Sequence, residues 1–117
     1  MNRKSLAMFF LLLISFVGHE ANAANITGRW EASIMGHQVK AVAEQKGQSV
    51  SGVAYLYDPF GNKTTWHFNG TIHGNNIQAA HHDGHKFVGK VVSDGKMSGI
   101  LETNNGFHIP LDIYSVR

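Results

Sequence analysis

Glycine divides the second half of the chain, from Phe68 to Ile113, into short apolar runs. The breaks between these runs are tight-turn pairs, namely Gly74-Asn75, Asp83-Gly84, Asp94-Gly95 and Asn105-Gly106. Turn pairs of this kind between short alternating runs are typical of β-hairpins. A meander this regular usually closes into a small barrel, because closure removes the exposed edges of an open sheet.

Alternation of apolar and polar residues predicts eight strands and no helix. The expected strands are Ile26–Ser33, His37–Gln45, Ser49–Tyr57, Lys63–Ile72, Asn76–His81, His85–Val92, Lys96–Thr103 and Phe107–Ser115. We therefore predict an all-β, eight-stranded antiparallel up-and-down barrel, with a two-sheet β-sandwich as the alternative. Hairpins join all successive strands without a long crossover, which favours the barrel.

Loop length predicts which residues face each other across each hairpin. We expect a two-residue turn at Gly74-Asn75 and three-residue loops ending in glycine at His82–Gly84, Ser93–Gly95 and Asn104–Gly106. The resulting inward-facing pairs are Ile72 with Ile77, Gly70 with Ala79, Ala79 with Phe87, Val91 with Met97 and Leu101 with Ile109. Glycine also recurs in mid-strand on the inward face, where we expect it to let the strands bend around a narrow barrel.

The first residues have the three parts of a secretory signal: Arg3 and Lys4, an apolar run from Leu6 to Val17, and a small-residue cleavage site at Ala21-Asn22-Ala23. We predict a signal peptide over residues 1–23 and a single barrel domain over residues 24–117. The apolar run is shorter than the roughly 20 residues that span a bilayer, so no membrane anchor is expected. The predicted location is periplasmic or secreted.

Charge and motif content exclude several functions. Without the leader the chain has eight Lys and Arg against seven Asp and Glu, with no basic cluster, so nucleic acid is not an expected partner. There is no cysteine. No nucleophile elbow, phosphate-binding loop or zinc-protease helix motif occurs, so the protein is not expected to be an enzyme.

A candidate site lies where the odd-numbered hairpins meet. Loops 34–36, 58–62, 82–84 and 104–106 share one end of an up-and-down barrel, and this end is the expected mouth. Three inward imidazoles at this end, those of His37, His81 and His85, could bind a divalent metal. Asp58 and Asp83 could accept hydrogen bonds from these metal-binding imidazoles. The expected ligand-binding residues are His37, Trp66, Phe68, His81, His85 and Phe107.

The segment Ile26-Thr27-Gly28-Arg29-Trp30 resembles the opening Gly-x-Trp strand of lipocalins and of avidin and streptavidin, which belong to the calycin group of eight-stranded barrels. The resemblance implies that the tryptophan packs across the closed end of the barrel, beneath an arginine that would here be Arg117. It does not extend to biotin, because Ala32 and His37 occupy the positions of the asparagine and serine that receive the ureido oxygen, and Ala54 falls near that of the tyrosine.

Two functions follow from these features. The first is an exported barrel that binds a small molecule or a metal ion in its pocket or at its histidine-bearing rim. The alternative is a protein-interaction module, similar to small periplasmic barrel inhibitors of hydrolases or acting as an envelope assembly subunit. That module would use outward Val42, Val53, Tyr55 and Tyr57, and a homo-oligomer is then a further expectation.

Overall fold

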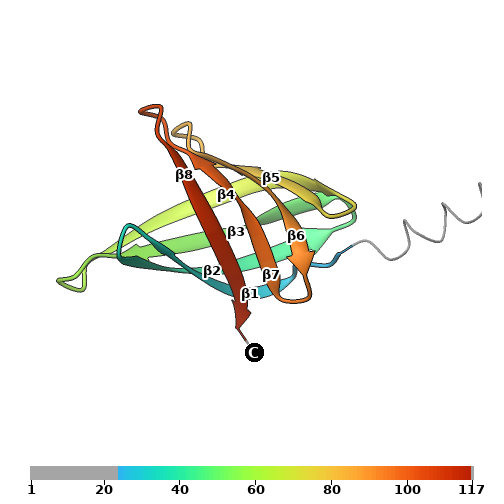
Figure 1. The fold of residues 1–117 in the computed structure, drawn as a ribbon, viewed down its shortest axis with the longest axis horizontal. Helices are drawn as coiled ribbons and strands as arrows, with labels where there is room; N and C mark the ends of the chain where they lie inside the picture. Colours follow the sequence, from blue (N-terminus) through green and yellow to red (C-terminus); the bar gives the residue numbers. More distant parts are fainter. Residues whose placement is uncertain (1–23, 117) are drawn as a thin grey trace, which may run out of the picture.

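Eight antiparallel strands form a closed barrel in the computed structural model, which describes residues 24–116 (Figure 1). The strands are β1 (Gly28–Ile34), β2 (His37–Lys46), β3 (Ser49–Tyr57), β4 (Lys63–His73), β5 (Asn76–Ala80), β6 (Lys86–Ser93), β7 (Lys96–Glu102) and β8 (His108–Val116). Each strand pairs with the next, and β8 pairs with β1. The predicted meander barrel is confirmed, and every predicted strand end lies within two residues of the observed one.

The predicted signal peptide and Arg117 lie outside the described residues. Over residues 24–116 no helix is long and apolar enough to span a bilayer.

The predicted cross-strand pairs all occur, but one predicted loop is wrong. Ser93 pairs with Lys96 across a two-residue turn at Asp94-Gly95, so the three-residue loop Ser93–Gly95 does not form. A bulge between Val91 and Ser93 takes up the extra residue. Val91 still pairs with Met97, because the extra residue in the bulge compensates for a turn that is one residue shorter than predicted.

The core lies at the end of the barrel that carries the turns at residues 47–48, 74–75 and 94–95, here called the closed end. Its buried side chains are Ile26, Trp30, Ala43, Val50, Ile72, Ile77 and Met97. The Trp30 indole Nε1 donates a hydrogen bond to the Ile26 carbonyl oxygen at 2.9 Å, so its polar atom is satisfied within the core. Trp30 thus packs at the closed end, the place that the calycin resemblance implies.

A clasp made by Gln45 holds the segment that precedes β1 against the closed end. The Gln45 side-chain oxygen accepts from the Ile26 N–H at 2.9 Å, and its amide nitrogen donates to the Ala24 carbonyl at 3.2 Å. Ile26 is only 2% exposed. The residues before β1 therefore plug this end of the barrel.

The turns at the closed end are also bonded to neighbouring strands. The carbonyl oxygens of Gln48, Asn75 and Gly95 accept hydrogen bonds of 2.8–2.9 Å from the N–H groups of Ile72, Val91 and Ser115, respectively. These bonds extend the sheet ladders into the turns and draw the strands together there.

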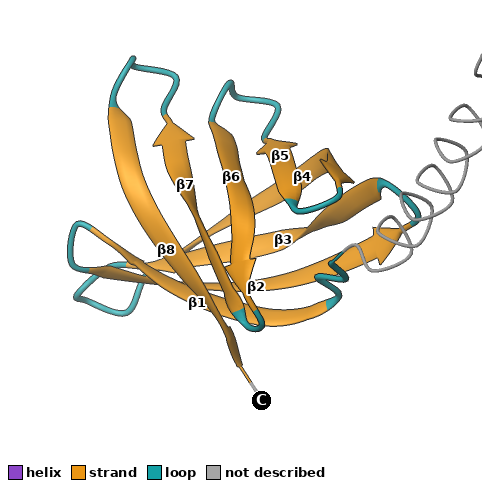
Figure 2. Ribbon diagram, turned by 45° about the vertical axis from the view of Figure 1, so that its right-hand side comes forward, coloured by secondary structure: helices purple, strands orange, loops and turns teal. Residues whose placement is uncertain are grey.

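At the opposite, open end the barrel splits into two lips. The β4–β5 ladder stops at the Asn69–Ala80 pair, and the β1–β8 ladder stops at Ala32–Ile113. We call β1–β4 with their two open-end hairpins the first lip, and β5–β8 with theirs the second lip. The two pairs of hairpins diverge in Figures 1 and 2. The barrel is thus closed at one end and open at the other.

Inward aromatic rings lie directly over mid-strand glycines. A Cβ at Gly52 would lie 2.6 Å from Phe68 Cζ, and one at Gly89 would lie 2.7 Å from Phe87 Cζ. A side chain at either glycine would displace the ring beside it. The mid-strand glycines therefore make room for aromatic rings as well as for strand bending.

Candidate functional site

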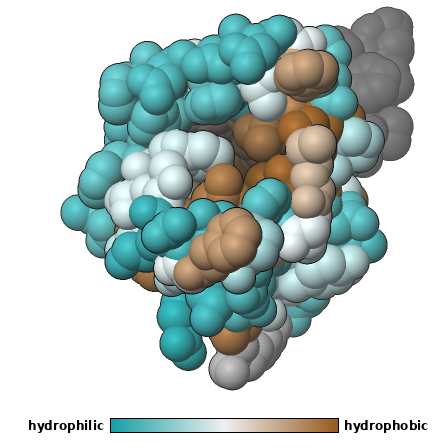
Figure 3. Space-filling model, turned by 90° about the vertical axis from the view of Figure 1, so that its left-hand side faces the viewer, coloured by the Kyte–Doolittle hydropathy of each residue, from teal (hydrophilic) through white to brown (hydrophobic). Residues whose placement is uncertain are grey.

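An apolar cavity of about 150 Å³ lies inside the barrel and opens between the lips. Figure 3, which looks into the open end, shows brown apolar atoms at the bottom of a hollow with a largely hydrophilic rim. Alanines from several strands leave this space open: Ala32, Ala41, Ala43, Ala54, Ala79 and Ala80 line it. Of the predicted ligand-binding residues, Trp66, Phe68, His81 and His85 line the same cavity.

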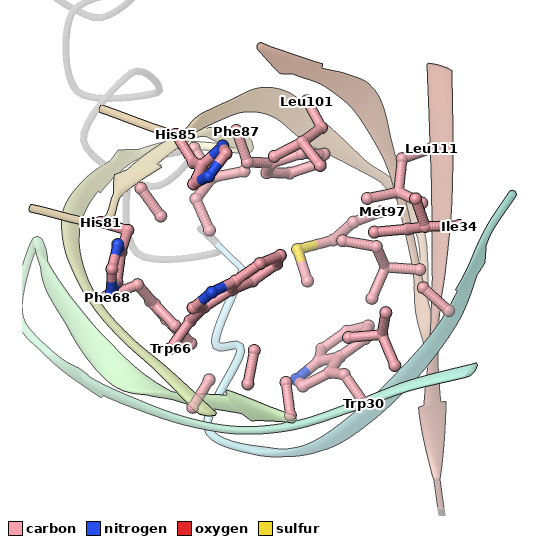
Figure 4. Close-up of a pocket in the computed structure, with 18 of the residues that line it drawn as sticks. Trp30, Ile34, Trp66, Phe68, His81, His85, Phe87, Met97, Leu101 and Leu111 are labelled. Carbon is pink, nitrogen blue, oxygen red and sulfur yellow. The ribbon is translucent and has the colours of Figure 1, made fainter. Parts of the chain in front are cut away.

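Trp66, His81 and His85 form the cavity wall at the split between β4 and β5. The Trp66 ring centroid lies 5.3 Å from that of His85 and 6.2 Å from that of His81. In Figure 4 the Trp66 ring reaches into the middle of the cavity, with the two imidazoles on one side and Met97 on the other. These side chains form the wall where the backbone ladder has stopped.

The two imidazoles each use one nitrogen within the second lip. His81 Nδ1 accepts from the Asp83 N–H at 3.2 Å, and His85 Nδ1 accepts from the Asn104 N–H at 3.4 Å. Because Nδ1 of each ring is used in this way, Nε2 is the remaining polar atom of each imidazole. The two ring centroids are 6.4 Å apart.

Asn104 fixes the histidine-bearing loop against the next hairpin. Besides its backbone bond to His85, its side-chain amide donates to the Asp83 carbonyl at 3.2 Å. The two hairpins of the second lip are thus bonded to each other, which holds both imidazoles in place.

His37 does not join the other two histidines. It belongs to the first lip and does not line the cavity. Its Nδ1 is buried and has no hydrogen-bond partner among residues 24–116. The predicted convergence of His37, His81 and His85 is wrong because the lips diverge, whereas strand parity specifies only that all three face inward.

The structure instead groups His81 with His82 and Asp83. One ligand atom from each of the three lies within 4.8 Å of the others, and within residues 24–116 this is the only such group. His82 Nε2 lies 3.2 Å from an Asp83 carboxylate oxygen, and His81 Nδ1 lies 3.5 Å from the other oxygen. The sequence analysis did not include His82 in the site because it selected histidines that face inward, and the His82 side chain is exposed. The position of His82 beside Asp83 in a tight loop is the signal that could have identified it.

Phe107 is also misplaced by the sequence analysis. It is 64% exposed and does not line the cavity. Its parity matches inward Ile109 and Leu111, but it precedes β8 at the tip of the second lip. The β1–β8 ladder stops at Ala32–Ile113, well before Phe107, so inward parity does not bury this side chain.

Asp58 caps its own loop instead of supporting a metal ligand. One carboxylate oxygen accepts from the N–H groups of Phe60 and Asn62 at 2.9 and 2.8 Å, and the other accepts from the Asn62 side-chain amide at 3.0 Å. The bond from the Asn62 side chain, followed by those from the backbone, lowers the pKa of Asp58 below its ordinary 3.8. The loop that carries Phe60 is therefore internally braced.

The outer face proposed for a protein partner is partly covered by lysines. Lys63 Nζ lies 4.8 Å from the centre of the Tyr55 ring, and Lys40 Nζ lies 5.9 Å from that of Tyr57. Val42 is 47% exposed, while both tyrosines are half-buried. The tyrosines are thus engaged in local cation–π pairs.

No protein-family model and no curated protein sequence matches the chain. The geometry alone therefore defines the class: a closed eight-stranded antiparallel barrel with an apolar cavity that opens beside two histidines.

Proposed function

We propose that this protein binds a small, mainly apolar molecule in the barrel cavity and holds one polar group of that molecule against His81 and His85. The observation that carries the proposal is the cavity itself, since it has an apolar lining and two imidazoles at its wall. Binding pockets typically combine apolar walls with a few polar groups that orient the ligand.

The size and chemistry of the cavity define the class of ligand. An apolar cavity of about 150 Å³ accommodates a molecule the size of benzene. The Nε2–H groups of His81 and His85 would donate to an oxygen on that molecule. We infer a single-ring or short-chain compound that carries one hydrogen-bond acceptor, and we expect no catalysis.

The resemblance to the calycin group supports a binding role, because the protein has the same closed barrel and a tryptophan packed at the closed end. The segment that plugs the closed end argues against an inhibitor that acts through a free N-terminus, since Ala24 and Ile26 are hydrogen-bonded to Gln45. Export to the periplasm or the exterior is part of the proposal and depends on the predicted leader.

A divalent metal ion is the second candidate ligand, favoured by the grouping of His81, His82 and Asp83. It would bind on the loop at the edge of the cavity, since His81 also lines the cavity. A thermal shift with zinc, copper or nickel that disappears in His82→Ala would support this second candidate. An apolar ligand that still binds in His82→Ala would show that binding in the cavity does not depend on a bound metal ion.

The test uses toluene, benzyl alcohol and benzoate as probes, with binding followed by ligand-observed NMR. We expect all three to bind, and Ala54→Leu to abolish binding because the larger side chain fills the cavity. The double variant His81→Leu/His85→Leu should weaken the two oxygen-bearing probes about 2- to 10-fold, the effect of one hydrogen bond, and leave toluene bound. His67→Leu/His73→Leu, which changes two exposed histidines, is the matched control. Failure of toluene to bind the wild-type protein would overturn the proposal.

A further inference from the structure

Apolar side chains project from the tips of three of the four open-end hairpins. Met35 is 80% exposed, Phe60 is 89% exposed and Phe107 is 64% exposed. They are the three most exposed large apolar residues among those described. They come from the β1–β2, β3–β4 and β7–β8 hairpins, which all lie at the open end of the barrel (Figure 1).

The closed end provides an internal comparison. Its three turns are Gly47-Gln48, Gly74-Asn75 and Asp94-Gly95, none of which carries an apolar side chain. Both ends are built from exposed hairpins, so exposure alone does not explain the difference. The apolar tips are a property of the open end.

Met35 occupies a turn position that disfavours its side chain. Its φ is +51° and that of Gly36 is +83°, the arrangement for which Asn-Gly is preferred. A left-handed conformation is unfavourable for a residue with a Cβ, and an 80% exposed side chain gains little from packing. The local structure therefore does not account for a methionine there.

Phe60 is held outward by the bonds that brace its loop. Asp58 accepts from the Phe60 N–H, and the Gly61 N–H donates to the Asp58 carbonyl at 3.1 Å. The braced backbone presents the ring at the loop tip, where it is 89% exposed. This arrangement favours contact with a partner outside the molecule.

We propose that Met35, Phe60 and Phe107 dock the open end of the barrel onto the surface of a lipid bilayer. A fluid bilayer can cover all three tips, although they lie on two diverging lips. The cavity of a second copy of the chain, about 150 Å³ in volume, is too small to receive three such side chains. Charges close to the tips are mixed, with Asp58 and Lys63 flanking the Phe60 loop, so no strong repulsion from either neutral or anionic lipid is expected.

Docking in this orientation places the mouth of the cavity against the lipid. The ligand class is then an apolar compound dissolved in the bilayer, and this assignment of its source rests on the proposed function. Docking itself rests only on the tips, so the two are tested separately.

The absence of cysteine allows a direct test of orientation with single labels. Asn105→Cys at the open end and Asn75→Cys at the closed end, each carrying a polarity-sensitive dye, form a matched pair of turn asparagines. We expect phosphatidylcholine vesicles to shift the emission of the Asn105→Cys label to the blue and to leave that of the Asn75→Cys label unchanged.

The contribution of the tips is measured by co-sedimentation with the same vesicles. Phe60→Ser and Phe107→Ser should each lower partitioning about tenfold, because burying one aromatic side chain contributes at least that factor. Val42→Ser, which changes a 47% exposed residue on the outer wall, should leave partitioning unchanged.

Three results would overturn the inference: no partitioning of the wild-type protein, equal responses of the two labels, or loss of self-association in the tip variants without any partitioning. The last result would assign the tips to an interface between copies. Toluene binding in Phe60→Ser reports on the cavity alone, so failure of docking and failure of the proposed function are distinguishable.

Discussion

Replacing Gly70 by alanine tests whether β4 and β5 are as close as the structure shows. A Cβ at Gly70 would overlap the Gln78 carbonyl oxygen and lie 2.6 Å from Ala79 Cα. Both are backbone atoms, so no side-chain rotation relieves the overlap. The two strands would have to separate to restore even a 3.0 Å contact, the shortest that real Cβ atoms show.

The cost of that separation follows from the short β4–β5 ladder. Its five residue pairs run from Asn69–Ala80 to His73–Asn76. Hydrogen-bonded pairs alternate along a ladder, so Gly70 lies between two of them, Asn69–Ala80 and Thr71–Gln78, which together exchange four bonds. Disrupting four bonds at about 0.5–1.5 kcal/mol each would lower the free energy of unfolding by about 2–6 kcal/mol. Overpacking usually costs about 1–3 kcal/mol. Both estimates are compatible with a loss of about 3 kcal/mol.

Urea unfolding followed by tryptophan fluorescence measures this loss as a fall in the free energy of unfolding. Thermal unfolding should show a drop in Tm of roughly 12–24 °C for a domain of this size. Gly47→Ala is the control, because its Cβ would meet no atom within 4 Å and only the φ of +62° is unfavourable, which costs about 1 kcal/mol. A Gly70→Ala loss no larger than that of Gly47→Ala would refute the close approach of β4 and β5.

Three further predictions concern the plug, the braced loop and the free edge. Ile26→Ala should lower the free energy of unfolding by about 3 kcal/mol because Ile26 fills the closed end, and an unchanged urea midpoint would contradict the plug. Asn62→Ala should raise the pKa of Asp58 towards 3.8 in an NMR titration, with Asn69→Ala as the control. The Asp58 carboxylate is the bonded form, so in the wild-type protein the brace persists to a pH below 3.8 and is lost as the pH falls through the lowered pKa. Pro110→Thr should promote self-association in light scattering by adding an N–H donor to the unpaired edge of β8, and a monodisperse variant would argue against that edge.

The edge prediction depends on the direction of the Pro110 nitrogen. The Thr103 N–H donates to the Phe107 carbonyl, so those residues form a hydrogen-bonded pair. Alternation then makes Ile100–Pro110 a non-hydrogen-bonded pair, and the proline nitrogen faces away from β7. The β1–β8 ladder stops at Ala32–Ile113, so at Pro110 that side of β8 has no strand partner within the described part of the chain.

Local chemistry explains why the barrel was predictable. A hairpin register depends on a few adjacent residues, and the pairing of Ala79 with Phe87 follows from the three-residue loop at His82–Gly84 alone. The error at Ser93 left the register intact, because a bulge in the strand replaces one residue of the loop. His81 and His85 were placed correctly beside each other for the same reason, since both flank one loop.

The errors at the site involve relations between hairpins. His37 and Phe107 have the correct inward parity, but parity does not say how far the wall opposite them extends. That depends on where the β4–β5 and β1–β8 ladders stop, and β1 and β8 lie at opposite ends of the described chain. The pairing of Trp66 with the two imidazoles also follows from this split.

The sequence by itself determined the strands, their pairing and the inward face, because turn residues and alternation act between near neighbours. Only the tertiary structure decided the shape of the two ends. Bonds from the turn carbonyls and the Gln45 clasp draw one end together, while early termination of two ladders lets the other diverge. Closure of a barrel depends on all eight strands at once, and this is why its mouth, cavity and exposed tips emerge only in three dimensions.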